Sequence, residues 1–242
     1  MRGWWREIAG LVLPVACGGC GRPRTELCEE CGAQLHGGAP RRVSPVPEPA
    51  GLPVVHAAAG YENAVRALLL AHKERGALGL AGALGKALAG AVGAGAGSLS
   101  DPGPLLLVPV PSARRAVAAR GHDPTRRIAL AAAAQLRRTG TPARVAAVLR
   151  QRRPVADQSG LGAGDRRANL AGALEVVAGG GRLLVAGRVV LVDDLLTTGA
   201  SLAEAARAID AVDGPDSARP GVRQAAVVAV SPSSFEINRN WK

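Results

Sequence analysis

Val189-Val-Leu-Val-Asp-Asp-Leu-Leu-Thr-Thr-Gly-Ala-Ser201 is an apolar run that ends in two acids and a Thr/Gly turn. Four consecutive aliphatic residues are typical of a strand that is buried on both faces of a parallel sheet. A helical pattern follows at 200–212, so the turn joins a strand to a helix. In open α/β sheets, ligands bind outside the carboxyl ends of the strands. The segment therefore predicts an α/β fold and the position of its site.

Apolar runs alternate with helical patterns along the rest of the chain, as in a parallel sheet flanked by helices. The expected strands are 105–111, 144–149, 188–193 and 224–230, and the expected helices are 61–76, part of 77–97, 124–138 and 200–212. Residues 112–123 and 151–168 are expected to be loops that carry arginines, the second of them running into a short helix. Many of the prolines fall at 37–53, which indicates a linker.

The turn at the end of the decisive strand has the composition of a phosphate site. Its backbone N–H groups and the hydroxyls of Thr197, Thr198 and Ser201 are expected to converge at the helix N-terminus, which begins at Ala200. Gly199 would let the backbone approach a ligand closely. These features suit a dianionic phosphate.

The two acids before the turn cannot face the same phosphate. Asp193 and Asp194 can accept hydrogen bonds from vicinal ribose hydroxyls a few ångströms away, so the whole segment suits a ribose 5-phosphate. One alternative is a core strand whose acids cap the helix, which would not require the following Thr-Thr-Gly-Ala-Ser. Another is an ATPase strand, which needs a G-x-x-x-x-G-K-[ST] loop that the sequence lacks.

The four cysteines form two close pairs, Cys17-Gly-Gly-Cys20 and Cys28-Glu-Glu-Cys31, separated by seven residues. Such spacing can place four thiolates tetrahedrally around one structural zinc ion. Two disulfides or an iron–sulfur cluster are alternatives, the first disfavoured in a chain without an export signal. We favour zinc.

The formal net charge of +11 attracts anions, whether nucleic acid, acidic lipid or a phosphorylated small molecule. Aromatic residues make up only 2% of the chain, which argues against stacking of single-stranded bases. Every apolar run of membrane-spanning length is interrupted by charge, Gly or Pro, so no membrane span is expected. The apolar stretch before Cys17 resembles a lipoprotein signal, but Glu7 and Pro14 argue against it. We expect a cytoplasmic protein.

Several motifs occur in one order along the chain. They are the cysteine pairs, His72-Lys-Glu-Arg-Gly76, Val108-Pro-Val-Pro111, Arg120-Gly121, Asp157-Gln-Ser-Gly-Leu161 leading to Arg166 and Asn169, and Asp193-Asp-x-x-Thr-Thr-Gly199. The last matches the type I phosphoribosyltransferase signature at every position. Together they resemble the ComF-type (GntX-like) phosphoribosyltransferase family, which is associated with DNA uptake in naturally competent bacteria.

The resemblance implies a zinc-binding knuckle module at 1–36, joined by the linker 37–53 to a phosphoribosyltransferase-type α/β domain at 54–242. This glycosyltransferase-class domain would bind 5-phosphoribosyl-1-pyrophosphate (PRPP) with magnesium and transfer the phosphoribosyl group to an unidentified acceptor. Asp193 and Asp194 would be its catalytic acids. An acid stands at the position of Thr197 in enzymes for 6-oxopurines, so hypoxanthine and guanine are disfavoured.

The resemblance also suggests arginines for the pyrophosphate. Arg114, Arg115 and Arg120 follow the Val-Pro-Val-Pro run, and Arg166 lies in an expected cover at 151–169. The family often has Arg-Gly-Phe-Asn-Gln where this chain has Arg120-Gly-His-Asp-Pro124, which leaves the roles of His122 and Asp123 open. The alternative function is a non-catalytic competence protein that meets single-stranded DNA or DNA-uptake proteins through its basic surface and zinc knuckle.

Overall fold

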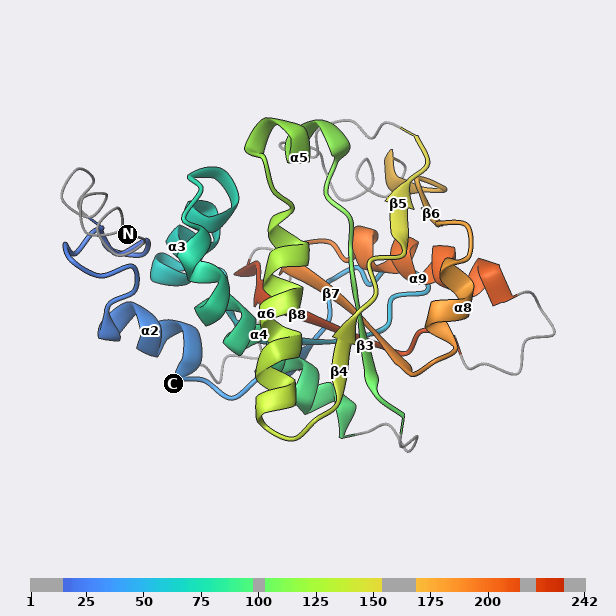
Figure 1. Cartoon of the computed structure of the whole chain (residues 1–242), viewed down its shortest axis with the longest axis horizontal. Coiled ribbons are helices and arrows are strands. Elements are labelled where there is room, and N and C mark those ends of the chain that lie inside the picture. The colour runs from blue at the N-terminus through green and yellow to red at the C-terminus, as the bar shows by residue number, and fades with distance from the viewer. Residues whose placement is uncertain (1–14, 98–102, 154–168, 214–220, 233–242) are drawn as a thin grey trace, which may run out of the picture.

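The computed structural model describes residues 15–97, 103–153, 169–213 and 221–232. Six strands form one sheet with helices on both faces (Figure 1). Their order is β1 (Arg41–Val43), β2 (Val54–Gly60), β8 (Gln224–Val230), β7 (Arg188–Leu196), β3 (Leu105–Pro109) and β4 (Ala143–Val145). Within this sheet only β1 runs antiparallel to its neighbour. The expected α/β class is confirmed, and the arrangement is compatible with a type I phosphoribosyltransferase-like fold.

Two hydrophobic cores lie on opposite faces of the sheet because side chains alternate along each strand. On β7, Val190 and Val192 belong to one core and Leu191 to the other. The first core includes α3 (Asn63–Glu74), α4 (Ala81–Ala96) and α6 (Pro124–Arg138). The second includes α9 (Ala200–Asp213) and the short α8 (Gly180–Leu184). Burial on both faces explains the continuous apolar run of β7.

The crossovers on the two sides of β7 run in opposite directions. From β3 the chain passes through α6 to β4, whereas from β7 it passes through α9 to β8, on the other face. Strand β3 ends at Pro109, opposite Val192, while β7 continues beside β8 to Leu196. Pairing of β3 with β7 therefore ends just before Asp193, at the carboxyl end of the sheet, where α/β folds bind ligands.

Some elements differ from the sequence-based expectation. Strand β2, which pairs along β8, was not predicted, because its sequence VVHAAAG is rich in Ala and has weak strand propensity. The expected loop at 112–123 contains the helix α5 (Arg114–Arg120). The expected strand at 144–149 is divided between β4 and β5 (Leu149–Gln151), and β5 pairs antiparallel with β6 (Leu174–Val176). Residues 41–43 of the expected linker form β1.

One helical stretch in the described ranges, Leu78–Ala96, has the length and composition of a membrane-crossing helix. It comprises the short η1 (Leu78–Leu80) followed by α4, and 56% of its most apolar window is buried inside the protein. Leu84, Leu88 and Val92 lie in the first core, and Gly85 allows close contact with Ala131 of α6. Its apolar character serves packing between α6 and the sheet.

Candidate functional site

The turn after β7 has the geometry expected of a strand-to-helix junction. Gly199 has φ +74°, a left-handed conformation that other residues rarely adopt, and α9 begins at Ala200. A Cβ on Gly199 would lie 3.1 Å from Cδ1 of Leu52, so the glycine also makes room for the segment before β2. Thr197 and Ser201 line the cleft beside the turn. The first-turn amides of α9 have no helical acceptor and are suited to an anion.

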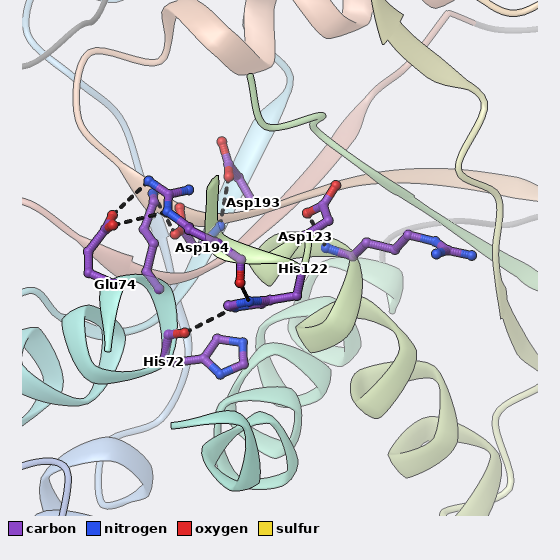
Figure 2. A network of polar contacts seen from close by, with 9 residues as sticks. His72, Glu74, His122, Asp123, Asp193 and Asp194 are labelled. Carbon is purple, nitrogen blue, oxygen red and sulfur yellow. Dashed lines mark hydrogen bonds and ion pairs between the residues drawn. The ribbon is translucent and has the colours of Figure 1, made fainter. Parts of the chain in front are cut away.

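The two acids at the end of β7 have different partners (Figure 2). The backbone N–H of Asp194 donates to Oδ1 of Asp193 over 2.8 Å. Oδ2 of Asp194 accepts a hydrogen bond from Nζ of Lys73 at 2.8 Å, and the Asp194 side chain is only 8% exposed. Asp194 is therefore a largely buried carboxylate that forms an ion pair with Lys73 in the cleft.

Burial, and then the charge of Asp194, raise the pKa of the Asp193 carboxyl well above its ordinary value, against the opposing effect of Lys73. The charge of Asp194 raises the pKa of Lys73, outweighing the effect of its burial. Lys73 therefore stays cationic, and Asp193 accepts a proton more readily than a free aspartic acid does.

A cleft of about 880 Å³ opens in front of these groups. Of the residues predicted to bind the ligand, six line it: Asp193, Asp194, Thr197, Ser201, Arg115 and Arg120. Thr198, Gly199 and Ala200 shape the turn without lining the cleft, and Arg114 is exposed outside it. Arg166 and the motif at 157–161 lie outside the described residues. The cleft thus unites both halves of the predicted ribose 5-phosphate site with two of the predicted arginines.

The ends of α3 and α5 form one wall of the cleft. Both carboxylate oxygens of Glu74 accept hydrogen bonds from Arg120, at 3.0 and 2.8 Å (Figure 2). The ring of His122 lies between two carbonyls, with Nδ1 3.1 Å from the oxygen of Arg120 and Nε2 3.2 Å from that of His72. Asp123 caps α6 by accepting the N–H of Arg126 at 3.0 Å. His122 therefore links the end of α5 to α3, Asp123 caps α6, and Arg120 is already paired with Glu74.

No protein-family model matches the chain, and no curated protein matches it.

The β5–β6 pair covers another side of the cleft. Gln151 and Leu174 line it from this pair. Oε1 of Glu204 on α9 accepts the N–H of Leu174 at 3.0 Å, and Arg207 donates to the Leu174 carbonyl at 3.1 Å. Glu204 is only 6% exposed and is paired with Arg207 on the same helix, so these two hydrogen bonds to Leu174 connect α9 to the cover. The helix that begins after Gly199 thereby also contacts the cover.

The four cysteines form a second candidate site. Their Sγ atoms all lie within 4.8 Å of one another, and Sγ of Cys20 is 3.5 Å from that of Cys28. Tetrahedral zinc at ~2.3 Å from each sulfur would place the sulfurs ~3.8 Å apart. The N–H of Cys28 donates to Sγ of Cys17 over 3.4 Å, which links the two cysteine pairs. All four thiols are free, so the cluster can bind a metal such as zinc.

The cysteine cluster packs directly on α3 (Figure 1). Cys17, Cys28 and Cys31 share the first core with Leu68 and other residues of α3. A Cβ on Gly19 would lie 2.6 Å from Sγ of Cys31, so only glycine fits there. The predicted boundary between 1–36 and the α/β domain stays a prediction, while packing makes one continuous core of the two.

Lys73 and Glu74 were missed as site residues by the sequence reasoning. The motif His72-Lys-Glu-Arg-Gly76 was noted only as part of the resemblance, and no role was derived for its charges. Lys73 stands 121 residues before its partner Asp194, so the sequence gives no local sign of the contact. A signal was present in the placement of consecutive charges at the end of an otherwise amphipathic helix.

Proposed function

We propose that this chain binds PRPP, or a closely related phosphoribosyl compound, in the cleft at the end of β7 and transfers the phosphoribosyl group to an acceptor. The observation that supports this most is the pairing of two carboxylates with a strand-to-helix anion turn across one cleft. Asp193 and Asp194 would accept hydrogen bonds from the ribose hydroxyls. The turn at 197–201 would bind the 5-phosphate.

Phosphoribosyl transfer requires the protein mainly to position the reacting groups and to neutralise the departing pyrophosphate. The C1–oxygen bond to pyrophosphate breaks as the acceptor bonds to C1, and positive charge grows on the ring in between. By accepting hydrogen bonds from the ribose hydroxyls, Asp193 and Asp194 would hold C1 in position. Arg115, near the mouth, would meet the leaving pyrophosphate. The β5–β6 cover would exclude water.

Magnesium fits this proposal as a cation that arrives with the ligand. The described lining holds three basic side chains, Lys73, Arg115 and Arg120, and three acidic ones, Glu74, Asp193 and Asp194. A cleft balanced in this way cannot neutralise a pyrophosphate alone, so a divalent cation on the ligand would supply the missing charge. We also infer that the four-cysteine cluster binds zinc, and that the chain belongs to the ComF-type family.

Calorimetry with PRPP and magnesium tests the binding, and a screen of nucleobases for pyrophosphate release tests the transfer. We expect saturable binding at one site per chain, with competition by ribose 5-phosphate. If PRPP failed to bind at millimolar concentration while the protein remained folded, the proposed function would be wrong.

A further inference from the structure

Two adjacent carboxylates at the floor of a cleft are ordinarily a good site for a divalent cation, because Mg²⁺ and similar ions prefer carboxylate oxygens. Here one of the two already has a cation. Nζ of Lys73 lies 2.8 Å from Oδ2 of Asp194, and Lys73 comes from α3, on the other side of the cleft floor. The ammonium group stands where an ion bound to Asp194 would otherwise sit.

We propose that Lys73 is a specificity-determining residue that makes the Asp193–Asp194 pair an acceptor of ligand hydroxyls and prevents the free cleft from binding a bare divalent cation. The identification of those hydroxyls as ribose hydroxyls rests on the proposed function. The exclusion of the cation depends only on Lys73 and the two acids.

The charge balance of the pair changes sharply with Lys73. With both carboxylates ionised and Lys73 in place, the three groups carry one net negative charge, and without Lys73 they carry two. Mutual repulsion between the acids would then be relieved by a bound cation. The raised pKa of Asp193, caused by burial and then by Asp194, shows that this repulsion is present even beside Lys73.

Among the described residues, Lys73 is the cation paired with Asp194, although Arg115 and Arg120 also line the cleft. Arg120 has another partner, because both its Nε and a terminal nitrogen donate to Glu74. The carboxylate of Glu74 thus holds Arg120 on the wall, whereas Lys73, one residue earlier on α3, donates to Asp194. The consecutive residues Lys73 and Glu74 therefore bind different partners, Asp194 and Arg120.

Helix α3 is well suited to hold Lys73 in this position. At its start, the N–H of Ala64 donates to Oε1 of Gln34 in α2 (Glu29–His36) at 3.4 Å. Just after its end, Arg75 donates to the carbonyl of Gly18 at 3.4 Å. The cysteine module therefore contacts α3 near both ends, and the Lys73 stem emerges from a fixed last turn.

The test measures Mn²⁺ binding to the zinc-loaded, full-length chain without any other ligand, by electron paramagnetic resonance. Lys73→Met should bind Mn²⁺ at least about tenfold more tightly than the parent, since one opposing charge has been removed next to the carboxylates. Lys86→Met is the matched control, because Lys86 is exposed on α4 and absent from the cleft lining, and it should behave like the parent. Lys73→Arg should restore exclusion of the ion.

Adding Asp194→Asn to Lys73→Met should abolish the gained Mn²⁺ site, which shows where the ion binds. The proposal is overturned if Lys73→Met gains no Mn²⁺ affinity, or if the parent itself binds Mn²⁺ at a site that Asp194→Asn removes. The second result needs no Lys73 variant to fold. Failure of the parent to bind ribose 5-phosphate would instead count against the proposed function, and the Mn²⁺ comparison would be unaffected.

Discussion

The four-cysteine cluster and the carboxylate cleft both contact α3, but their polar groups have different kinds of partner. In the cluster, the four sulfurs lie within 4.8 Å of one another, and three of the cysteines, Cys17, Cys28 and Cys31, belong to an apolar core. In the cleft, Asp194 and Arg120 each have an oppositely charged partner, on α3. A closed set of ligands is typical of structural metal sites, and a paired, open set is typical of sites that exchange ligands.

The largest effect we expect comes from breaking the cluster with Cys28→Ser. Cys28 is 5% exposed and lies in the core that includes α3. Losing one thiolate should release the metal and lower the free energy of unfolding of the whole chain by about 3 kcal/mol or more. Urea unfolding together with metal analysis measures both quantities.

Cys20→Ser is the control for that experiment, because Cys20 is exposed and offers a thiol without core burial. It should also lose metal but cost less stability than Cys28→Ser. An unchanged unfolding midpoint in metal-free Cys28→Ser would mean that the module is independent of the α3 core.

The next largest effect should come from Gly199→Val, which acts on the cleft alone. The left-handed backbone and the contact with Leu52 both oppose a β-branched side chain, so the turn should distort and lose both inorganic phosphate and ribose 5-phosphate. We expect a loss of about 2 kcal/mol in binding free energy, or about 30-fold in affinity. Gly140→Val is the control, since Gly140 has φ +87° but follows α6 at the far end of the sheet. Equal loss of affinity in both variants would indicate a general loss of folding.

Substitution of the two acids should change the free energy of unfolding in opposite directions. Asp194→Asn leaves Lys73 without its counter-ion and should destabilise the fold by about 1–2 kcal/mol. Asp193→Asn should stabilise it at neutral pH, because folding raises the pKa of Asp193 and thus penalises its ionised form. Thermal unfolding measures both.

The pH dependence provides the check on Asp193. Above the raised pKa, the parent bears the full cost of an ionised, partly buried carboxylate. That cost decreases as the pH falls, and it is absent below ~3.9, the ordinary pKa of Asp, where both states are protonated. The advantage of Asp193→Asn should therefore vanish in acid. An advantage that persists there would have a cause other than ionisation.

The smallest effect distinguishes two adjacent arginines. Arg115 lines the cleft and Arg114 lies exposed outside it. Because both are arginines, the two variants differ only in the position of the charge that is removed. Arg115→Ala should weaken PRPP binding about fivefold, as expected for a partly solvated charged contact, whereas Arg114→Ala should change it less than about twofold. Equal effects in competition calorimetry would show that only the overall positive charge matters.

Local sequence was enough to predict some parts of this molecule. The β7 strand, its two acids, the glycine turn and α9 are contiguous, and the cysteine spacing is short, so neighbouring residues alone define each geometry. Strand β2 was missed because its Ala-rich sequence becomes a strand through pairing with β8, over 160 residues later. The role of Lys73 was missed for the same reason, since its contact with Asp194 exists only in the folded chain.

The helix α5 shows a different limit. Its seven residues contain no buried position, so no apolar periodicity marks it in the sequence. Its position over the cleft decides which arginines reach the ligand, and it brings Arg115 and Arg120 to the cleft while Arg114 stays outside. The run of arginines predicted that this segment meets an anion, but helix α5 determines which of the arginines line the cleft.

We propose that Asp193 and Asp194 hold ribose hydroxyls while the turn at 197–201 holds the phosphate. Calorimetry of the double variant Asp193→Asn, Asp194→Asn with ribose 5-phosphate and with inorganic phosphate tests this directly. We predict that ribose 5-phosphate loses about 1–3 kcal/mol for each charged hydrogen bond removed, and that inorganic phosphate binds as in the parent. Parent-like affinity of the double variant for ribose 5-phosphate would contradict the account.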